Sequence, residues 1–474
     1  MLTVQTPNNY KPERGYILSV ILDDFLGIEY KHHCEDRRDT RITTEDGREL
    51  IIADGLFSVS ERLWLKPGSL PITPLKWWAL DGTPFGLGTA NSKLPVIYGK
   101  NPEDIGFFTR SKDKIHLGLD VFGSAFFMLT LYEEVIKADR DPRNRFPYTA
   151  SLAFRSGFLD RPIVNEYVEI LWACLSHLWP GLRRKQRQFQ IYASHDIDAP
   201  FLWATAGITR LIKECIFAVT RSHSPSLLVN NVLDWVKIKA QGEKRDPYNT
   251  FDRIMDISEK HNLKSAFYFI AGNTAGGLDG DYRMEHPLIL ELLRNIHRRG
   301  HEIGLHLSYN TFEDAVQTKK EFQHLKEVCA SQGIEQKRWG SRQHFLRWKT
   351  PVTFQNVSDA GLDYDTTVSF ADTPGFRCGV CYEFPVFNVL TGQKLPLIER
   401  PLVVMDCTVT GARCMRPGLD AQKAINTILN YRNQCKRYHG NFTILWHNNR
   451  FVNEQEVEIY RQSLARKTKN QKLL

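Results

Sequence analysis

Strands and helices alternate regularly along the second half of the chain, and this alternation limits the possible folds more than any other feature of the sequence. Apolar runs typical of buried strands occupy residues 189–194, 265–270, 301–306 and 442–446. Amphipathic patterns typical of helices occupy residues 250–261, 287–299 and 312–332. Strands joined by helices of this length predict a parallel sheet or a β/α barrel, so the fold class is α/β.

The length of 474 residues predicts more than one domain. We expect an N-terminal α/β domain of unknown role at residues 1–188, a barrel at 189–460 and a basic, frayed tail at 461–474. Within the first domain, the helical spacing of apolar residues over 121–137 predicts one helix, with Glu133 and Glu134 on its polar side. Residues 202–239 are apolar and helix-like, with a break at 222–225.

Composition and charge are ordinary for a folded, soluble protein, and attraction to an acidic polymer or a membrane face is the less favoured alternative. The hydrophobic fraction is 42%, the charged fraction is 24%, and the net charge of +8 is scattered without a dense basic block. The first residues do not resemble a secretory signal, and the apolar run at 16–22 is too short to span a bilayer, so we expect a cytoplasmic protein. Nine cysteines, with one tight pair at Cys378 and Cys381, argue against a disulfide framework.

Two carboxylates follow the strand at 189–194 at the point where barrel enzymes gather their catalytic groups. Asp196 and Asp198 share a face if the strand persists, because alternate residues of a strand point the same way. One carboxylate could then bind a cation while the other accepts a proton. The alternative is a polar loop in which Asp198 caps the next helix.

Three further strand ends carry imidazole or guanidinium groups. His306 ends the strand that starts at His301, and His447 ends the strand at 442–446. Arg342 and His344 lie together in a short strand-to-loop region, where the guanidinium could orient Asp196. A lone histidine at a strand end is usually structural, but a carboxylate pair in the same position favours a metal site.

The ordered motifs resemble those of the polysaccharide deacetylase family, also called the NodB homology or carbohydrate esterase 4 family. The motifs are Asp196-Ile197-Asp198, the segment 300–306, the Arg342 segment, the segment 361–365 and Leu445-Trp446-His447. The resemblance covers residues 190–450 and leaves the N-terminal domain outside it. It implies a distorted β/α barrel and a divalent metal, often zinc, that activates water to remove an acetyl group from a sugar.

The same resemblance implies a role for each matching residue. Asp196 resembles the general base, Arg342 the residue that orients it, and His447 the general acid. Asp198 and His306 resemble metal ligands. The family's second metal histidine is replaced by Asn310, and we expect His344 to fill the gap. Asn310 as a weak oxygen ligand and a site without metal are the alternatives.

The function expected from these motifs is a hydrolase of carbon–nitrogen bonds that deacetylates an N-acetylated sugar in a bacterial glycan or glycan precursor. The alternatives are an inactive barrel that binds glycan or scaffolds a partner, and a hydrolase of a non-sugar amide. An intracellular precursor, or assembly at the inner membrane face, would bring such a substrate to a cytoplasmic protein. The sequence does not name the sugar, the metal or the oligomeric state.

Several other residues have two interpretations each. Asp406 is more simply a structural carboxylate than a cleft residue, and Asp363 and Asp365 either support Arg342 or form a turn. Phe376 and Arg377 either close a sugar subsite or form an ordinary loop. The tryptophans Trp64, Trp77 and Trp78 form buried core or a sugar platform, with core favoured.

Overall fold

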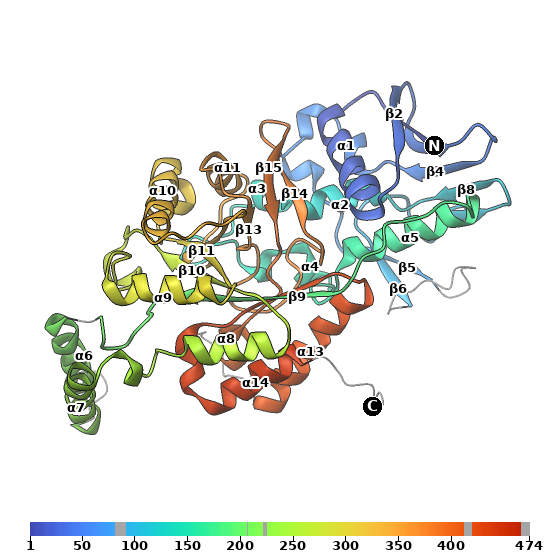
Figure 1. Cartoon of the computed structure of the whole chain (residues 1–474). Helices are drawn as coiled ribbons and strands as arrows, with labels where there is room; N and C mark the ends of the chain where they lie inside the picture. Colours follow the sequence, from blue (N-terminus) through green and yellow to red (C-terminus); the bar gives the residue numbers. More distant parts are fainter. Residues whose placement is uncertain (81–91, 206, 221–224, 412–419, 466–474) are drawn as a thin grey trace.

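The alternating strands and helices form a curled, open sheet of nine strands in the computed structural model, which describes residues 1–80, 92–205, 207–220, 225–411 and 420–465 (Figure 1). In spatial order the strands are β14 (Phe384–Asn388), β15 (Gln393–Glu399), β13 (Tyr364–Asp365), β12 (Gly340–Gln343), β11 (Glu302–Leu307), β10 (Ser265–Ile270), β9 (Gln190–Ile197), β17 (Asn441–Leu445) and β16 (Val404–Met405).

Parallel pairing brings the ends of the strands to one edge of this sheet. All neighbouring strands pair in parallel except β14, which is antiparallel to β15. Tyr268 pairs with both Asp196 and Gly304, and His306 pairs with Arg342, so His306 and Arg342 lie two residues nearer the carboxyl edge of the sheet than Asp196. Within the described residues β14 and β16 are not paired with each other, so the barrel is open between them.

Helices cover the sheet, and the sequence predicted three of them to within two or three residues. These three are α8 (Phe251–Lys260), α9 (Pro287–Arg298) and α10 (Ala315–Ser331). The others are α11 (Val352–Asp359), α12 (Asp406–Thr410), α13 (Ala421–Arg437) and α14 (Glu454–Leu464). Residues 461–464 of the predicted tail therefore belong to α14, and residues 466–474 lie outside the described residues.

The N-terminal region has its own mixed sheet. The strands run in the order β2 (Tyr30–Glu35), β1 (Leu2–Pro7), β3 (Asp39–Thr43), β4 (Glu49–Ala53), β8 (Lys114–Leu117) and β7 (Phe108–Arg110), with a separate hairpin of β5 (Lys76–Ala79) and β6 (Lys93–Val96). The helices are α1 (Lys11–Leu18), which continues into a π-helix at Ser19–Leu26, α2 (Val121–Leu129), α3 (Tyr132–Ile136), α4 (Leu152–Arg155) and α5 (Ile163–Leu178).

The N-terminal region and the barrel share one continuous hydrophobic core. Tyr16 of α1 stacks on Phe387 of β14 with ring centroids 4.7 Å apart, and its hydroxyl donates to the carbonyl of Pro385 at 2.8 Å. In a second, buried contact between the two regions, the Arg377 guanidinium binds both carboxylate oxygens of Glu134 at 2.7 and 2.8 Å. Arg377 is therefore a structural residue that joins the two regions, not the rim of a sugar subsite.

The prediction of one helix over residues 121–137 was wrong. Leu131 adopts a left-handed backbone conformation with φ of 52°, which separates α2 from α3. The break turns both glutamates inward, and the predicted polar side is buried. Glu133 accepts from the backbone nitrogen of Leu152, and Glu134 pairs with Arg377, so tertiary contacts outweigh helix continuity.

The tryptophans and the paired cysteines are mostly packing residues. Trp64 lies among core rings, 4.4 Å from Tyr10, and Trp78 is buried, whereas Trp77 is 37% exposed beside Arg161. Cys378 and Cys381 are free and buried, and burial raises the pKa of the Cys378 thiol well above its ordinary value. The Cys378 thiol therefore lacks the thiolate character that a metal or redox pair needs.

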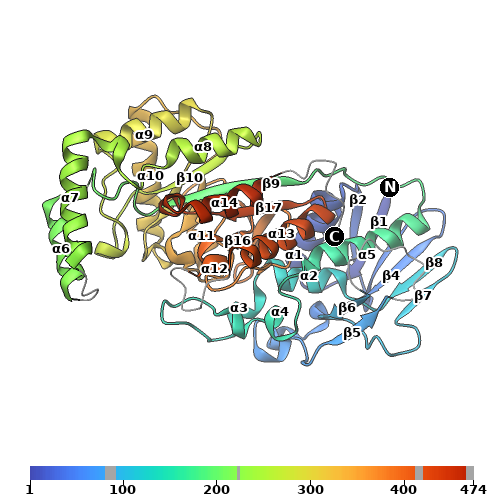
Figure 2. The same cartoon turned by 90° about the horizontal axis from the view of Figure 1, so that it is seen from below.

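A helical hairpin stands apart from the rest of the molecule (Figures 1 and 2). It consists of α6 (Ile208–Thr220) and α7 (Pro225–Gln241), as the helix-like stretch at 202–239 predicted. Of the break predicted at 222–225, only Pro225 lies in the described residues. Among the described helices, none has the length and apolar character needed to pass through a bilayer.

The buried Glu134–Arg377 pair makes a stability prediction. Glu134→Gln leaves the Arg377 guanidinium buried without its counter-charge, so we expect the free energy of unfolding to fall by about 3–5 kcal/mol. The matched control is Glu103→Gln, which breaks the exposed pair with Lys76 and should cost at most about 1 kcal/mol. Urea titration of both variants measures the difference, and equal midpoints would contradict the role of this pair.

Candidate metal centre

The candidate site is assembled at the carboxyl ends of four strands of the sheet, β12, β11, β9 and β17, with β10 lying between β11 and β9. Asp196 is the second-last residue of β9, and Asp198 directly follows that strand. His306 is in β11, Arg342 is in β12, and His344 follows β12 directly. His447 lies two residues after β17. The parallel order of β12, β11, β10, β9 and β17 therefore brings these distant residues together.

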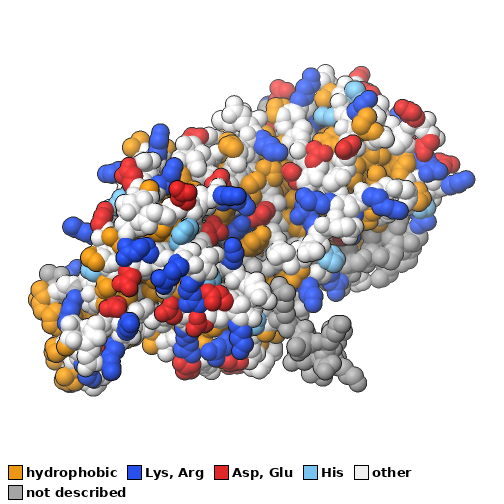
Figure 3. Space-filling model, in the orientation of Figure 1, with side chains coloured by type: hydrophobic (Ala, Val, Ile, Leu, Met, Phe, Trp, Pro, Cys, Tyr) orange, Lys and Arg blue, Asp and Glu red, His pale blue; other side chains and the backbone are white. Residues whose placement is uncertain are grey.

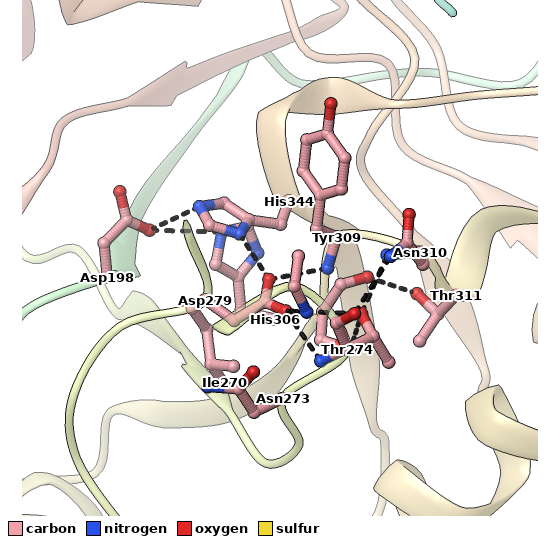
Figure 4. Close-up of polar contacts among 12 residues, drawn as sticks. Asp198, Ile270, Asn273, Thr274, Asp279, His306, Tyr309, Asn310, Thr311 and His344 are labelled. Carbon is pink, nitrogen blue, oxygen red and sulfur yellow. Dashed lines mark hydrogen bonds and ion pairs between the residues drawn. The ribbon is translucent and has the colours of Figure 1, made fainter. Parts of the chain in front are cut away.

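Three of these side chains converge on one point. One ligand atom each from Asp198, His306 and His344 lies within 4.8 Å of the other two (Figure 4). Asp198 Oδ1 is 3.3 Å from His306 Nε2 and 3.7 Å from His344 Nε2. Donors around a tetrahedral zinc ion are about 3.3–3.5 Å apart, given metal–ligand distances of about 2.0–2.1 Å. The three residues fit a small divalent cation.

Hydrogen bonds to the other ring nitrogens aim both histidines at this point. His306 Nδ1 donates to the Arg342 carbonyl at 2.9 Å, because a carbonyl can only accept. His344 Nδ1 lies 3.0 Å from Asp279 Oδ1 and donates to it. Each imidazole therefore presents an unprotonated Nε2 toward Asp198 in its neutral form, which is the arrangement that metal-binding histidines use.

Two of the converging atoms are buried without a hydrogen-bond partner. They are Asp198 Oδ1 and His306 Nε2. Buried polar atoms are almost always satisfied, so unpaired atoms aimed at one point fit a missing cation. Burial would raise the pKa of Asp198, but the surrounding imidazoles of His306, His344 and His447 outweigh it and hold that pKa well below its ordinary value. The carboxylate is thus ready to bind a positive charge.

Asp279 was not identified from the sequence, although it holds His344 in place. The same carboxylate accepts from the backbone nitrogens of Tyr309 at 2.7 Å and of Thr274 and Ala275 at 2.8 Å, so its position is fixed by three segments (Figure 4). Asp279 lies in the loop after β10, which ends at the same edge of the sheet. The only available sequence signal was an acidic residue after a strand, and Asp281 fits it equally well.

Asp196 is held by a buried guanidinium. Asp196 Oδ1 accepts from Arg342 at 3.0 Å, and its Oδ2 lies 3.7 Å from His306 Nε2. Arg342 is fully buried, and its remaining donors bind the Ser194 hydroxyl and the carbonyl and hydroxyl of Thr366. The arginine cannot swing away, so one carboxylate oxygen is fixed while the other faces the converging ligands.

His447 lies on the opposite side of Asp198 from this arginine pair. Its Nε2 is 3.8 Å from Asp198 Oδ2, while its Nδ1 contacts Asp406 at 2.8 Å. Burial would lower the pKa of His447, but the Asp406 carboxylate outweighs it and raises that pKa to about 9. Asp406 therefore has a direct contact with a site residue, beyond the purely structural role that the sequence favoured.

Asn310 points away from the converging ligands. Its side-chain nitrogen donates to the Thr274 carbonyl at 3.0 Å, and its side-chain oxygen accepts from Arg347 at 2.9 Å. In Figure 4 it lies on the far side of Thr274 from Asp198. Both ends of the amide are occupied, so the alternative in which Asn310 supplies an oxygen ligand has no support in this structure.

The other candidate residues have structural contacts. Asp363 accepts from the backbone nitrogen of Trp339 at 2.7 Å, a contact with the segment that precedes β12. Asp365 accepts from the Ser341 hydroxyl at 2.7 Å, directly beside Arg342, and burial raises its pKa to about 6. His195 points to the other face of β9, where its Nδ1 donates to the Trp446 carbonyl at 2.6 Å.

Residues from the N-terminal region support the loop that carries His344. Phe345 and Leu346, which follow it, have φ values of 59° and 52°, an uncommon backbone conformation for bulky residues. Arg145 donates to the Phe345 carbonyl at 2.9 Å, and the Arg143 guanidinium lies 4.1 Å from the centre of the Phe345 ring. The loop conformation thus depends on contacts from a segment about 200 residues earlier in the chain.

The comparisons with known proteins divide the chain. Residues 2–180 match a family of unknown function (DUF7033). No curated protein matches the chain. Among solved structures, a presumptive polysaccharide deacetylase from Mycobacterium smegmatis is 16% identical, with 60% of this chain and 84% of that chain covered and a TM-score of 0.39.

Two other solved structures show a similar degree of likeness. A probable polysaccharide deacetylase from Pseudomonas aeruginosa PAO1 is 12% identical, with 67% of this chain and 91% of that chain covered and a TM-score of 0.35. A Puue allantoinase is 12% identical, with 60% of this chain and 85% of that chain covered and a TM-score of 0.35. Because these likenesses are weak, the function of this chain is inferred from its own residues.

The support of the His344 loop can be tested through metal affinity. Arg145→Gln removes the donor to the Phe345 carbonyl, so we expect divalent-metal affinity to fall about tenfold, as for other outer contacts of metal ligands. The control is Arg140→Gln, because Arg140 is exposed in the same segment and its hydrogen bonds go to nearby backbone carbonyls rather than to the His344 loop. Competition with a chromophoric chelator measures the metal affinity of both variants. Unchanged affinity in Arg145→Gln would show that the His344 loop keeps its conformation without this contact.

Proposed function

We propose that this protein is a metal-dependent hydrolase that removes the acetyl group from an N-acetylated sugar in a glycan or glycan precursor. The observation that carries the proposal is the convergence of Asp198, His306 and His344, with the Asp196–Arg342 and His447–Asp406 pairs beside it. The motifs that supply these residues resemble those of polysaccharide deacetylases in order and in kind.

The donor set favours zinc. Two imidazoles and a carboxylate suit zinc and leave a fourth position open for water or substrate. Asp198, His306 and His344 would hold the ion, with Asp279 and the Arg342 carbonyl orienting the two histidines. When bound, zinc would supply Lewis-acid chemistry, which lowers the pKa of water and polarises an amide carbonyl.

Two residues of the chain would move the protons. The free oxygen of Asp196 accepts the proton of the attacking water, while Arg342 keeps the carboxylate in place. The Nε2 proton of His447 passes to the departing amine as the carbon–nitrogen bond breaks. At neutral pH His447 carries this proton, because Asp406 raises its pKa to about 9. Water and the amide become acetic acid and a free amine, and the proton that Asp196 takes up matches the one that His447 gives, so atoms and charge balance.

The division between base and metal ligand is testable by substitution. Asp196→Asn keeps the shape and the contact with Arg342 but removes the base, so we expect full metal content and a turnover lowered at least about 100-fold. Asp198→Ala removes a ligand, so we expect the metal to be lost as well. Elemental analysis and acetate release from N-acetylhexosamine oligomers measure the two properties separately.

Three outcomes would contradict parts of this proposal. Equal loss of metal in Asp196→Asn and Asp198→Ala would overturn the role assignment. Metal-free wild-type protein that still binds the oligomers would identify a glycan-binding barrel without catalysis. Loaded enzyme that releases no acetate from any N-acetylated sugar but hydrolyses a small cyclic amide would change the substrate class.

A further inference from the structure

The helical hairpin of α6 and α7 has more large apolar side chains in solvent than any other part of the described chain. Among the described residues, nine of the nineteen exposed large apolar side chains lie on it: Ile208, Ile212, Ile216, Phe217, Val219, Val229, Val232, Leu233 and Val236. Their exposed fractions run from 39% to 56%. Contiguous exposure on this scale indicates a surface that contacts a membrane or another protein.

The exposed residues are a second apolar surface, distinct from the small core of the hairpin. That core is made by Leu211 and Ile238 with Trp203, and Cys215 and Trp235 pack against it. Ile212 and Ile216 follow Leu211 and Cys215 by one residue, and Val236 follows Trp235 in the same way.

One residue is a rotation of about 100° around a helix. Because α6 and α7 are packed together and run in opposite directions, this rotation turns both exposed stripes to the same side of the hairpin. We call this side the apolar face, and define it by Ile208, Ile212, Ile216 and Val219 of α6 with Val229, Val232 and Val236 of α7.

Lysines flank the apolar face, whereas both acidic residues of the hairpin lie on the other side, which Glu214 shares with Arg210. The exposed Lys213 and Lys237 each follow a residue of the apolar face and flank its outer edges. Glu214 and Asp234, the only acidic residues of α6 and α7, each precede a core position by one residue and lie on the opposite side. Figure 3 shows apolar side chains along the outer edge of this hairpin with basic ones beside them. The apolar face is therefore bordered by positive charge.

We propose that the apolar face docks on an anionic membrane surface. Amphipathic helices of this kind bury their apolar side chains at the boundary between headgroups and acyl chains, while flanking lysines meet the anionic headgroups. The proposal does not depend on the proposed deacetylase function, since no residue of the hairpin belongs to the candidate metal centre.

The charge pattern favours a membrane over a second copy of the chain. A symmetric pair of hairpins would place Lys213 and Lys237 of both copies around one apolar seam. The acidic residues that could neutralise them, Glu214 and Asp234, lie on the opposite side. Like charges around such a contact oppose association, whereas an anionic surface complements them.

Vesicle flotation with the full-length protein tests the proposal. We expect the protein to float with vesicles of phosphatidylcholine and phosphatidylglycerol in equal parts, and to bind much less to phosphatidylcholine alone. Ile212→Glu with Ile216→Glu should abolish flotation. Lys213→Gln with Lys237→Gln should weaken binding by about fivefold for each lysine, and added salt should weaken wild-type binding.

The matched control places two glutamates on exposed apolar positions away from the hairpin. Ile105→Glu with Val316→Glu changes residues that are 107% and 80% exposed, and this variant should bind vesicles like the wild type. Thermal melting of all variants verifies that they are folded. Acetate release is measured on soluble oligomers, so the hairpin variants should release acetate like the wild type. A failure of the proposed deacetylase function can therefore be told apart from a failure of membrane docking.

Absence of wild-type binding to the anionic vesicles would overturn the proposal, as would equal binding by the hairpin and control variants. Light scattering tests the remaining possibility, which is that the apolar face binds a second copy of the chain. A wild-type dimer that Ile212→Glu with Ile216→Glu dissociates, without vesicle binding by the wild type, would assign the apolar face to a second copy and contradict membrane docking.

Discussion

The parallel pairing of β9 between β10 and β17 is the constraint on which the rest of the site depends. β9 carries Asp196, and Asp198 follows it, while the strands on either side determine what lies beside these carboxylates. On one side β10 separates β9 from β11, which leaves room for His306 to reach across to Asp198 at 3.3 Å. On the other side β17 is adjacent, so His447 reaches Asp198 from the opposite direction. A change of register by one residue would turn Asp196 to the far face of the sheet.

The sequence predicted four of the nine strands of this sheet, β9, β10, β11 and β17, and polar residues at their ends, because both depend on local patterns. Apolar runs bounded by turn residues located β10 and β11, and polar residues directly after such runs pointed to Asp198 and His306. Where the structure differs, the cause is a contact between distant segments. The helix over 121–137 breaks at Leu131 because Glu133 and Glu134 bind groups on other elements. No local pattern contains that information.

The carboxylates that orient the site were harder to predict than the residues they orient. Asp279 lies in an irregular loop, and its contact with His344 spans 65 positions. Asp406 and His447 are 41 positions apart and meet only because β16 pairs with β17. Such contacts depend on which strands are neighbours, and a single sequence does not determine strand order. The sequence pointed to Asp406 but not to Asp279, and it assigned neither carboxylate to its histidine.

In the proposed metal centre, His344 takes the place that Asn310 leaves open in the motif that the sequence resembles. At position 310 the side chain bonds to Thr274 and Arg347, so it stabilises the loop and leaves the ligand cluster one imidazole short. His344 supplies an imidazole from the next strand, but only with Phe345 and Leu346 in a costly left-handed conformation. Arg145 and Arg143 of the N-terminal region hold that conformation. The N-terminal region therefore contacts the loop that carries His344, the third ligand that we propose, and helps to hold that loop in place.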